Sequence, residues 1–101
     1  MRLEKIAHRA GLTVDEPTLR QALEAEGFAV WVWSDPPGAD YSPHSHDHDE
    51  SLWVLQGEIT FGAAGSEFTL GPGDRLMLPR DTVHTARAGA AGATYLIGEK
   101  Q

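Results

Sequence analysis

The sequence predicts an all-β fold, a barrel or sandwich of short strands preceded by one short α-helix. Eleven glycines and six prolines, most of them after residue 35, indicate frequent turns. The segments between these turns are short and rich in β-branched and aromatic residues, which favour strands. At 101 residues the chain has the length of one domain. We expect this domain to contain an N-terminal arm and helix over 1–27 and a β-barrel over 28–98.

The helix is expected over residues 18–26. Asp15 or Thr13 can cap its free backbone amides, and a proline follows in the first turn. Apolar residues then recur at helical spacing, and Gly27 can adopt the left-handed conformation that ends a helix. Residues 1–12 are expected to form either a strand or an extended arm that crosses the barrel or a partner subunit.

Strands are expected in close succession after the helix. In chain order they are residues 28–34, 51–56, 58–61, 66–70, 75–78, 82–87 and 93–97. Several of them are apolar on both faces; for example, Leu52 and Val54 alternate with Trp53 and Leu55. Because a small barrel buries only its inner face, we expect the helix and a second subunit to cover the outer one. This predicts a homodimer, and the alternative is that the helix and the arm suffice.

Charge and composition exclude several classes of protein. Fifteen acidic residues against eight basic ones give a net charge of −7 without a basic patch, so nucleic-acid binding is not expected. The longest apolar stretch, residues 28–33, is too short to span a bilayer, and no signal-peptide pattern is present. We therefore expect no membrane association and a cytoplasmic location. The chain has no cysteine, so nitrogen and oxygen atoms must hold any metal.

Three histidines and a glutamate are arranged as a metal site requires. His44 and His46 project to the same side of an extended chain, and Glu50 has the same parity and a longer reach. A barrel can bring the distant His84 beside them. Three neutral imidazoles and one carboxylate suit one divalent ion of iron, manganese, nickel, copper or zinc. Such an ion would keep coordination positions open for a small molecule.

Other interpretations of these residues stay open at this level. The alternating His/Asp run over 44–50 could be a solvated loop that binds metal loosely, and His84 could be a core histidine bonded to a backbone carbonyl. His48 shares the parity of His46, so it either approaches the cavity as a proton shuttle or substitute ligand, or lies at the rim. Tyr41 and Arg75 could meet an anionic substrate or be surface residues.

The pattern resembles the two conserved motifs of the cupin family. The first motif is matched at its correct spacing by Gly38, His44, His46, Glu50 and Gly57. The second is matched by Gly73, Pro79 and His84, whereas Asp81 replaces a glycine and Ala88 replaces an asparagine. The resemblance covers residues 38–88, about half of the chain. The two departures put the local turn at Asp81 in doubt, and also the contact that the asparagine makes in relatives.

The resemblance implies a double-stranded β-helix, the cupin or jelly-roll barrel, with a metal near its open end. It also implies that dimers are usual and that the metal ligands are His44, His46, Glu50 and His84. It implies no single reaction, because cupins include dioxygenases, isomerases and sugar-sensing domains. We expect a metal-dependent enzyme of oxygenase or isomerase type acting on a small molecule. The alternatives are a non-catalytic, sensor-like binding module and a structural barrel that its metal staples together.

Overall fold

Two long antiparallel strands, β4 (Asp49–Ala63) and β7 (His84–Lys100), organise the fold. In the computed structural model, which describes residues 1–101, they pair along almost their whole length. The sequence predicted two strands in place of each, because Gly57 and the glycines at 89 and 92 resemble turns. The pairing register shifts near Gly57 instead, so β4 bends there and stays in the sheet. Gly57 has a φ of 76°, a conformation that other residues seldom adopt.

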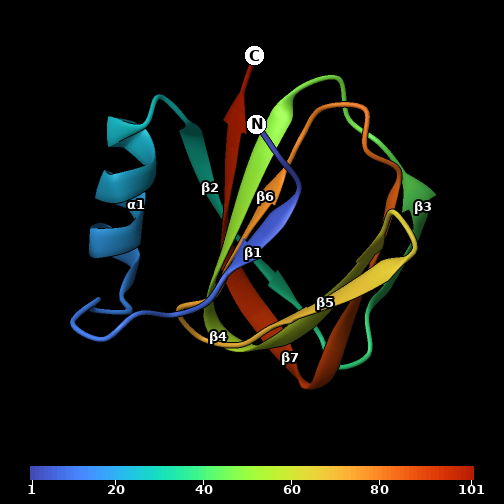
Figure 1. Cartoon of the computed structure of the whole chain (residues 1–101). Helices are drawn as coiled ribbons and strands as arrows, with labels where there is room; N and C mark the ends of the chain where they lie inside the picture. Colours follow the sequence, from blue (N-terminus) through green and yellow to red (C-terminus); the bar gives the residue numbers. More distant parts are fainter.

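The bend divides the strands into two layers (Figure 1). In one layer, the first half of β4 and the second half of β7 are flanked by β1 (Glu4–Ile6), β6 (Arg75–Leu78) and β2 (Ala29–Asp35). In the other, the remaining halves are flanked by β5 (Ser66–Leu70) and β3 (Asp40–His44). The expected all-β jelly-roll barrel is confirmed. β3 was not predicted, because Pro43 interrupts it, and residues 1–12 contain the strand β1.

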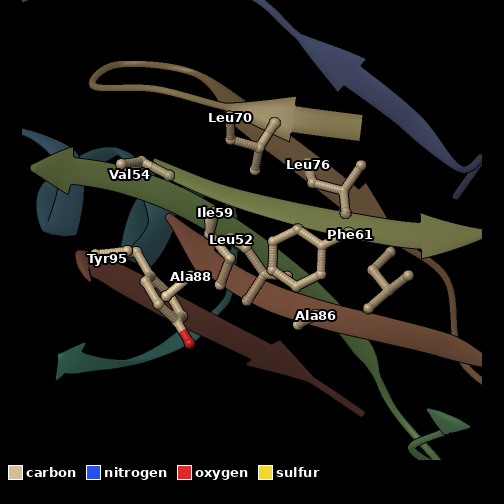
Figure 2. Close-up of a cluster of buried hydrophobic side chains, with 11 residues drawn as sticks. Leu52, Val54, Ile59, Phe61, Leu70, Leu76, Ala86, Ala88 and Tyr95 are labelled. Carbon is tan, nitrogen blue, oxygen red and sulfur yellow. The ribbon is translucent and has the colours of Figure 1, made fainter. Parts of the chain in front are cut away.

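The main hydrophobic core lies between the two layers. Its eleven buried residues are Leu52, Val54, Ile59, Phe61, Leu70, Leu76, Leu78, Ala86, Ala88, Ala93 and Tyr95. Figure 2 shows side chains from β4, β5, β6 and β7 converging between the strands. The two expected faces of β4 are present, since Leu52 and Val54 belong to this core while Trp53 belongs to a second cluster. Ala88, which replaces the motif asparagine, contributes a buried methyl group to this core.

Helix α1 (Glu16–Ala25) covers part of the outer face of the barrel (Figure 1). The Asp15 side chain accepts a hydrogen bond from the Thr18 amide at 2.8 Å, so the predicted cap is confirmed and the helix begins two residues earlier than expected. Between the helix and the barrel lies the second hydrophobic cluster, whose buried residues are Leu19, Leu23, Phe28, Trp53 and Leu96. This helix is shorter and less apolar than a segment that crosses a membrane must be.

Arg75 ties the end of this helix to the barrel. Its guanidinium donates two hydrogen bonds to the Glu26 carboxylate, at 3.0 and 2.6 Å, and lies 4.6 Å from the centre of the Trp53 ring. Leu76 and Leu78 on the same strand both point into the inner core, and side chains alternate between faces, so Arg75 points to the outer face. It therefore does not meet a substrate at the cavity mouth, which was one interpretation of the sequence.

Strand β2 forms an edge of the sheet and keeps apolar side chains exposed. Trp31 and Trp33 are each 51% exposed, and Val32 is also exposed. The helix and the N-terminal arm therefore leave this part of the apolar surface uncovered.

Candidate metal centre

Two histidines face each other across β3 and β7. His44 ends β3 and His84 begins β7; they are direct cross-strand partners, and their ring centres lie 4.3 Å apart. The Nδ1 atom of His44 is 2.7 Å from the Ser42 carbonyl oxygen, and Nδ1 of His84 is 2.9 Å from that of Thr82. Because a carbonyl only accepts, both Nδ1 atoms carry the proton. The Nε2 lone pair of each ring is thus left free for a metal.

His46 joins this pair from the loop between β3 and β4. Its ring centre lies 5.0 Å from that of His44 and 5.3 Å from that of His84. The His46 carbonyl oxygen accepts a hydrogen bond from the Asp81 amide at 2.7 Å, which joins this loop to the one between β6 and β7 (Figure 1). Asp81 has a φ of 63°, so the turn keeps the left-handed conformation although the motif glycine is replaced. The turn that the sequence left in doubt therefore supports the histidine loop.

The three histidines are close enough to share one ion. One ring nitrogen from each of His44, His46 and His84 lies within 4.8 Å of the others. Two ligand atoms held at roughly 2.1 Å from one ion are at most about 4.2 Å apart, so small side-chain movements suffice to bind it. Burial lowers the pKa of His84, and the neighbouring His44 and His46 lower it further. His84 is therefore neutral at pH 7, the form that binds metal.

Glu50 lies beside these histidines and is held by His48. Its carboxylate is buried, with Oε1 3.8 Å from His46 Nε2 and Oε2 3.2 Å from His48 Nε2. By distance, Glu50 forms a second group with His46 and His48 and not with His44 and His84. Parity along the chain did not reveal this arrangement, because the chain bends at residues 47–48. Oε1 is close enough to His46 Nε2 for the two atoms to share an ion while Oε2 stays with His48.

His48 lies behind Glu50 and does not line the cavity. Its Nε2 atom is 3.3 Å from Glu99 Oε1, so the imidazole lies between two carboxylates. Burial lowers the pKa of His48, but hydrogen bonds to Glu50 and Asp47 and the charge of Glu99 outweigh this effect and raise it. The side chain is largely buried, so it lies neither at an exposed rim nor in the cavity itself.

All four predicted ligands line one cavity of about 270 Å³. The other lining residues are Trp33, Tyr41, Leu52, Tyr95, Ile97 and Glu99. The cavity therefore combines nitrogen and oxygen donors with aromatic and aliphatic walls, and its volume admits a small molecule. Glu99 was not identified from the sequence, because nothing in its local pattern distinguishes it from a surface residue at the end of a strand.

A buried carboxylate, which the sequence also did not reveal, organises one wall of this cavity. Asp35 accepts hydrogen bonds from Tyr41 at 2.5 Å, Trp33 Nε1 at 2.9 Å and Tyr95 at 2.7 Å. The bond to Asp35 raises the pKa of Tyr41, and burial raises that of Tyr95, so both hydroxyls stay protonated at neutral pH. The sequence contained one signal for this role of Asp35: residues two apart on a strand share a face, so Asp35 lies on the same face as Trp31 and Trp33.

Comparisons with known proteins agree with this geometry. Residues 31–97 match the family model Cupin_2, described as a cupin domain. Quercetin 2,3-dioxygenase from Bacillus subtilis (strain 168) is 40% identical over 61 residues, which cover 59% of this chain and 18% of that protein.

Two solved structures are similar to most of the chain. DMSP lyase DddQ from Ruegeria pomeroyi DSS-3 has a TM-score of 0.68 and 29% identity, over 73% of this chain and 38% of that one. KdgF from Halomonas sp. has a TM-score of 0.61 and 27% identity, over 73% of this chain and 71% of that one. The chain thus spans less than a fifth of the dioxygenase and about two fifths of the lyase.

Proposed function

The chain belongs to the cupin family, and we propose that it is a metal-dependent enzyme acting on a small molecule at one divalent transition-metal ion. The proposed ligands are one nitrogen each from His44, His46 and His84 and the carboxylate of Glu50. One observation carries this proposal: three imidazoles and a carboxylate from separate elements converge in a cavity that has room for a ligand. Four protein ligands leave coordination positions of a six-coordinate ion for that ligand.

The residues fit such an ion and also provide for proton transfer. A bound ion of this class polarises a coordinated oxygen or, if redox-active, exchanges electrons with it. Glu99 lines the cavity and can accept a proton from a bound molecule. His48 Nε2 contacts both Glu99 and Glu50, and its Nδ1 atom lies 3.3 Å from the exposed Asp47 carboxylate. When His48 is neutral with its proton on Nδ1, Nε2 can take up the proton from Glu99 while Nδ1 releases one toward Asp47, without the ring itself entering the cavity. This gives His48 the role of a shuttle behind the site.

The relatives favour an oxygenase over an isomerase but do not identify the substrate. A dioxygenase matches this chain at 40% identity over 61 residues, whereas a lyase is similar in structure at 29% identity. Since the chain covers only 18% of that dioxygenase, we carry over the reaction type and leave the substrate open. A sensor-like module that binds the same molecules without converting them is the second candidate. The observation that favours it is that no serine, threonine, cysteine or lysine lines the cavity.

Turnover by reconstituted protein distinguishes these candidates. Metal-free protein is loaded with iron(II), manganese, nickel, copper or zinc in turn, and oxygen consumption and product formation are measured over a broad set of small molecules. We expect turnover with at least one redox-active ion. Glu99→Gln and His48→Gln should keep the metal and lose turnover, while Glu50→Gln should lose both. Thermal stabilisation by ligands without any product, whatever the metal, would refute the enzyme and support the sensor-like module.

A further inference from the structure

The cavity contains no cationic side chain. Its charged lining residues are Glu50 and Glu99, and none of its lining residues is a lysine or arginine. Two basic residues lie close in sequence to lining residues: Arg80 precedes His84, and Lys100 follows Glu99. Both side chains bond to backbone outside the cavity, since Arg80 donates to the Asp47 carbonyl oxygen and Lys100 donates to the Glu26 carbonyl oxygen. In the metal-free cavity, an anionic group on a ligand would therefore find no protein counter-ion and would face two carboxylates.

The aromatic residues of the wall offer ring surface and not hydrogen bonds. The indole N–H of Trp33 and the hydroxyls of Tyr41 and Tyr95 all donate to the buried Asp35. These three donors come from β2, β3 and β7, so one carboxylate fixes the orientation of three rings. Tyr95 also packs into the core beside Ala88, as Figure 2 shows. With their donors occupied, these residues give the cavity an apolar wall.

A second hollow extends this wall outward along β2. It is lined by Trp31, Val32, Trp33, Ile97 and Glu99, the last three of which also line the metal cavity. We call these five residues the β2 shelf. Trp31 and Trp33 lie two residues apart and so share a face of the strand. The apolar surface is therefore continuous from the histidines to two half-exposed indoles.

We propose that the cavity and the β2 shelf together bind an uncharged, planar, apolar molecule, whose rings lie against Trp31 and Trp33 and whose oxygen atoms reach the histidines. The contact between the ligand oxygens and a metal rests on the proposed function, whereas binding of the rings to the shelf requires no metal. The shelf is continuous with the cavity that contains the histidines and Glu50, and this favours a small molecule over a second copy of the chain as its occupant. Glu99, at the junction of both hollows, excludes anions.

The test uses metal-free protein and a matched pair of probes, 2-naphthol and 2-naphthol-6-sulfonate. Binding is followed by NMR through the indole N–H signals of the three tryptophans. We expect 2-naphthol to shift the signals of Trp31 and Trp33 but not that of Trp53, which lies under the helix and donates to the Gly73 carbonyl oxygen. The sulfonate should bind at least about ten-fold more weakly, and Glu99→Gln should narrow that difference.

Matched variants test the role of the indoles. Trp31→Ala removes an exposed ring without breaking a hydrogen bond of the side chain and should weaken 2-naphthol binding about ten-fold. Ile6→Ala, which removes an exposed apolar side chain from β1, should leave it unchanged. Equal affinity for the two probes, or no effect of Trp31→Ala, would overturn the proposal. So would a dimer that Trp31→Ala converts to monomers without weakening 2-naphthol binding.

A zinc-loaded sample separates this inference from the proposed function. Zinc should strengthen the binding of 2,3-dihydroxynaphthalene, whose adjacent oxygens can reach the ion, and should leave 2-naphthol much less affected. If both probes bind at the shelf and zinc changes neither affinity, the assignment of the ligand oxygens to the metal is wrong. If zinc binds stoichiometrically but neither probe shifts Trp31 or Trp33, the shelf assignment is wrong and the metal site stands.

Discussion

Replacing Glu26 by Gln should loosen the attachment of helix α1 to the barrel. The change keeps the size of the side chain but removes the charge that pairs with the buried Arg75 guanidinium. Two charge-assisted hydrogen bonds of this kind contribute about 1.5–3 kcal/mol each when fully buried. Because Glu26 is 44% exposed, and Gln can still accept one neutral hydrogen bond, we expect a loss of about 1–2 kcal/mol at pH 7. For a chain of 101 residues this lowers Tm by roughly 5–10 °C.

The loss should depend on pH in a defined direction. The hydrogen bonds and charge of Arg75 hold the pKa of Glu26 below its ordinary value of 4.5. Because the folded pKa lies below the unfolded one, the stabilisation is fully present above pH 4.5 and is lost as the pH falls through the folded value. The difference in the free energy of unfolding between the native protein and Glu26→Gln should therefore be constant near neutral pH and shrink in acid.

Urea denaturation followed by circular dichroism measures this difference at each pH. Glu24→Gln is the matched control, because it makes the same charge change on an exposed residue of the same helix that has no ion-pair partner. We expect the control to change the free energy of unfolding by less than about 0.5 kcal/mol. The reasoning is refuted if Glu26→Gln behaves like the control, or if its effect persists unchanged at a pH well below 4.5.

Three further predictions concern the backbone, the helix cap and the metal. In thermal melts, Gly65→Ala should cost about 1 kcal/mol for its left-handed φ, whereas Gly57→Ala should cost several times more, because its Cβ would lie 2.1 Å from the Gly92 carbonyl oxygen. Asp15→Ala should lose about 1 kcal/mol by urea denaturation and Asp15→Asn much less, since Asn also caps; equal losses would contradict the cap. Protein stripped of metal by a chelator should keep its far-ultraviolet circular dichroism, because the core contains no histidine; unfolding would instead favour the metal staple.

The parts of the fold that the sequence predicted are those set by local patterns. The helix cap at Asp15 and the strands 66–70 and 75–78 depend on residues close in the chain, and the structure contains them. The continuity of β4 through Gly57 depends instead on pairing with β7, which compensates for a glycine that locally favours a turn. A tertiary contact of this kind leaves no periodic signal in the sequence.

The candidate site divides in the same way. The spacing of His44 and His46 placed both on one side of the chain. The predicted strand over 82–87 offered His84 as a third ligand, which the family motif supported and which the structure brings opposite His44. The Asp35 cluster joins residues from three strands, so its hydrogen bonds could not be inferred from spacing. The same holds for Glu99, whose contact with His48 exists only because β4 and β7 pair.

The metal content of the purified protein tests the central claim most directly. Elemental analysis is made on the native protein, on His84→Ala and on His8→Ala, a histidine whose ring bonds to the Leu12 carbonyl oxygen in the N-terminal arm. Circular dichroism checks that each variant is folded. The account predicts one transition-metal ion per chain in the native protein and in His8→Ala, and its loss in folded His84→Ala. Native protein that takes up no stoichiometric metal, or folded His84→Ala that retains it in full, would contradict the account.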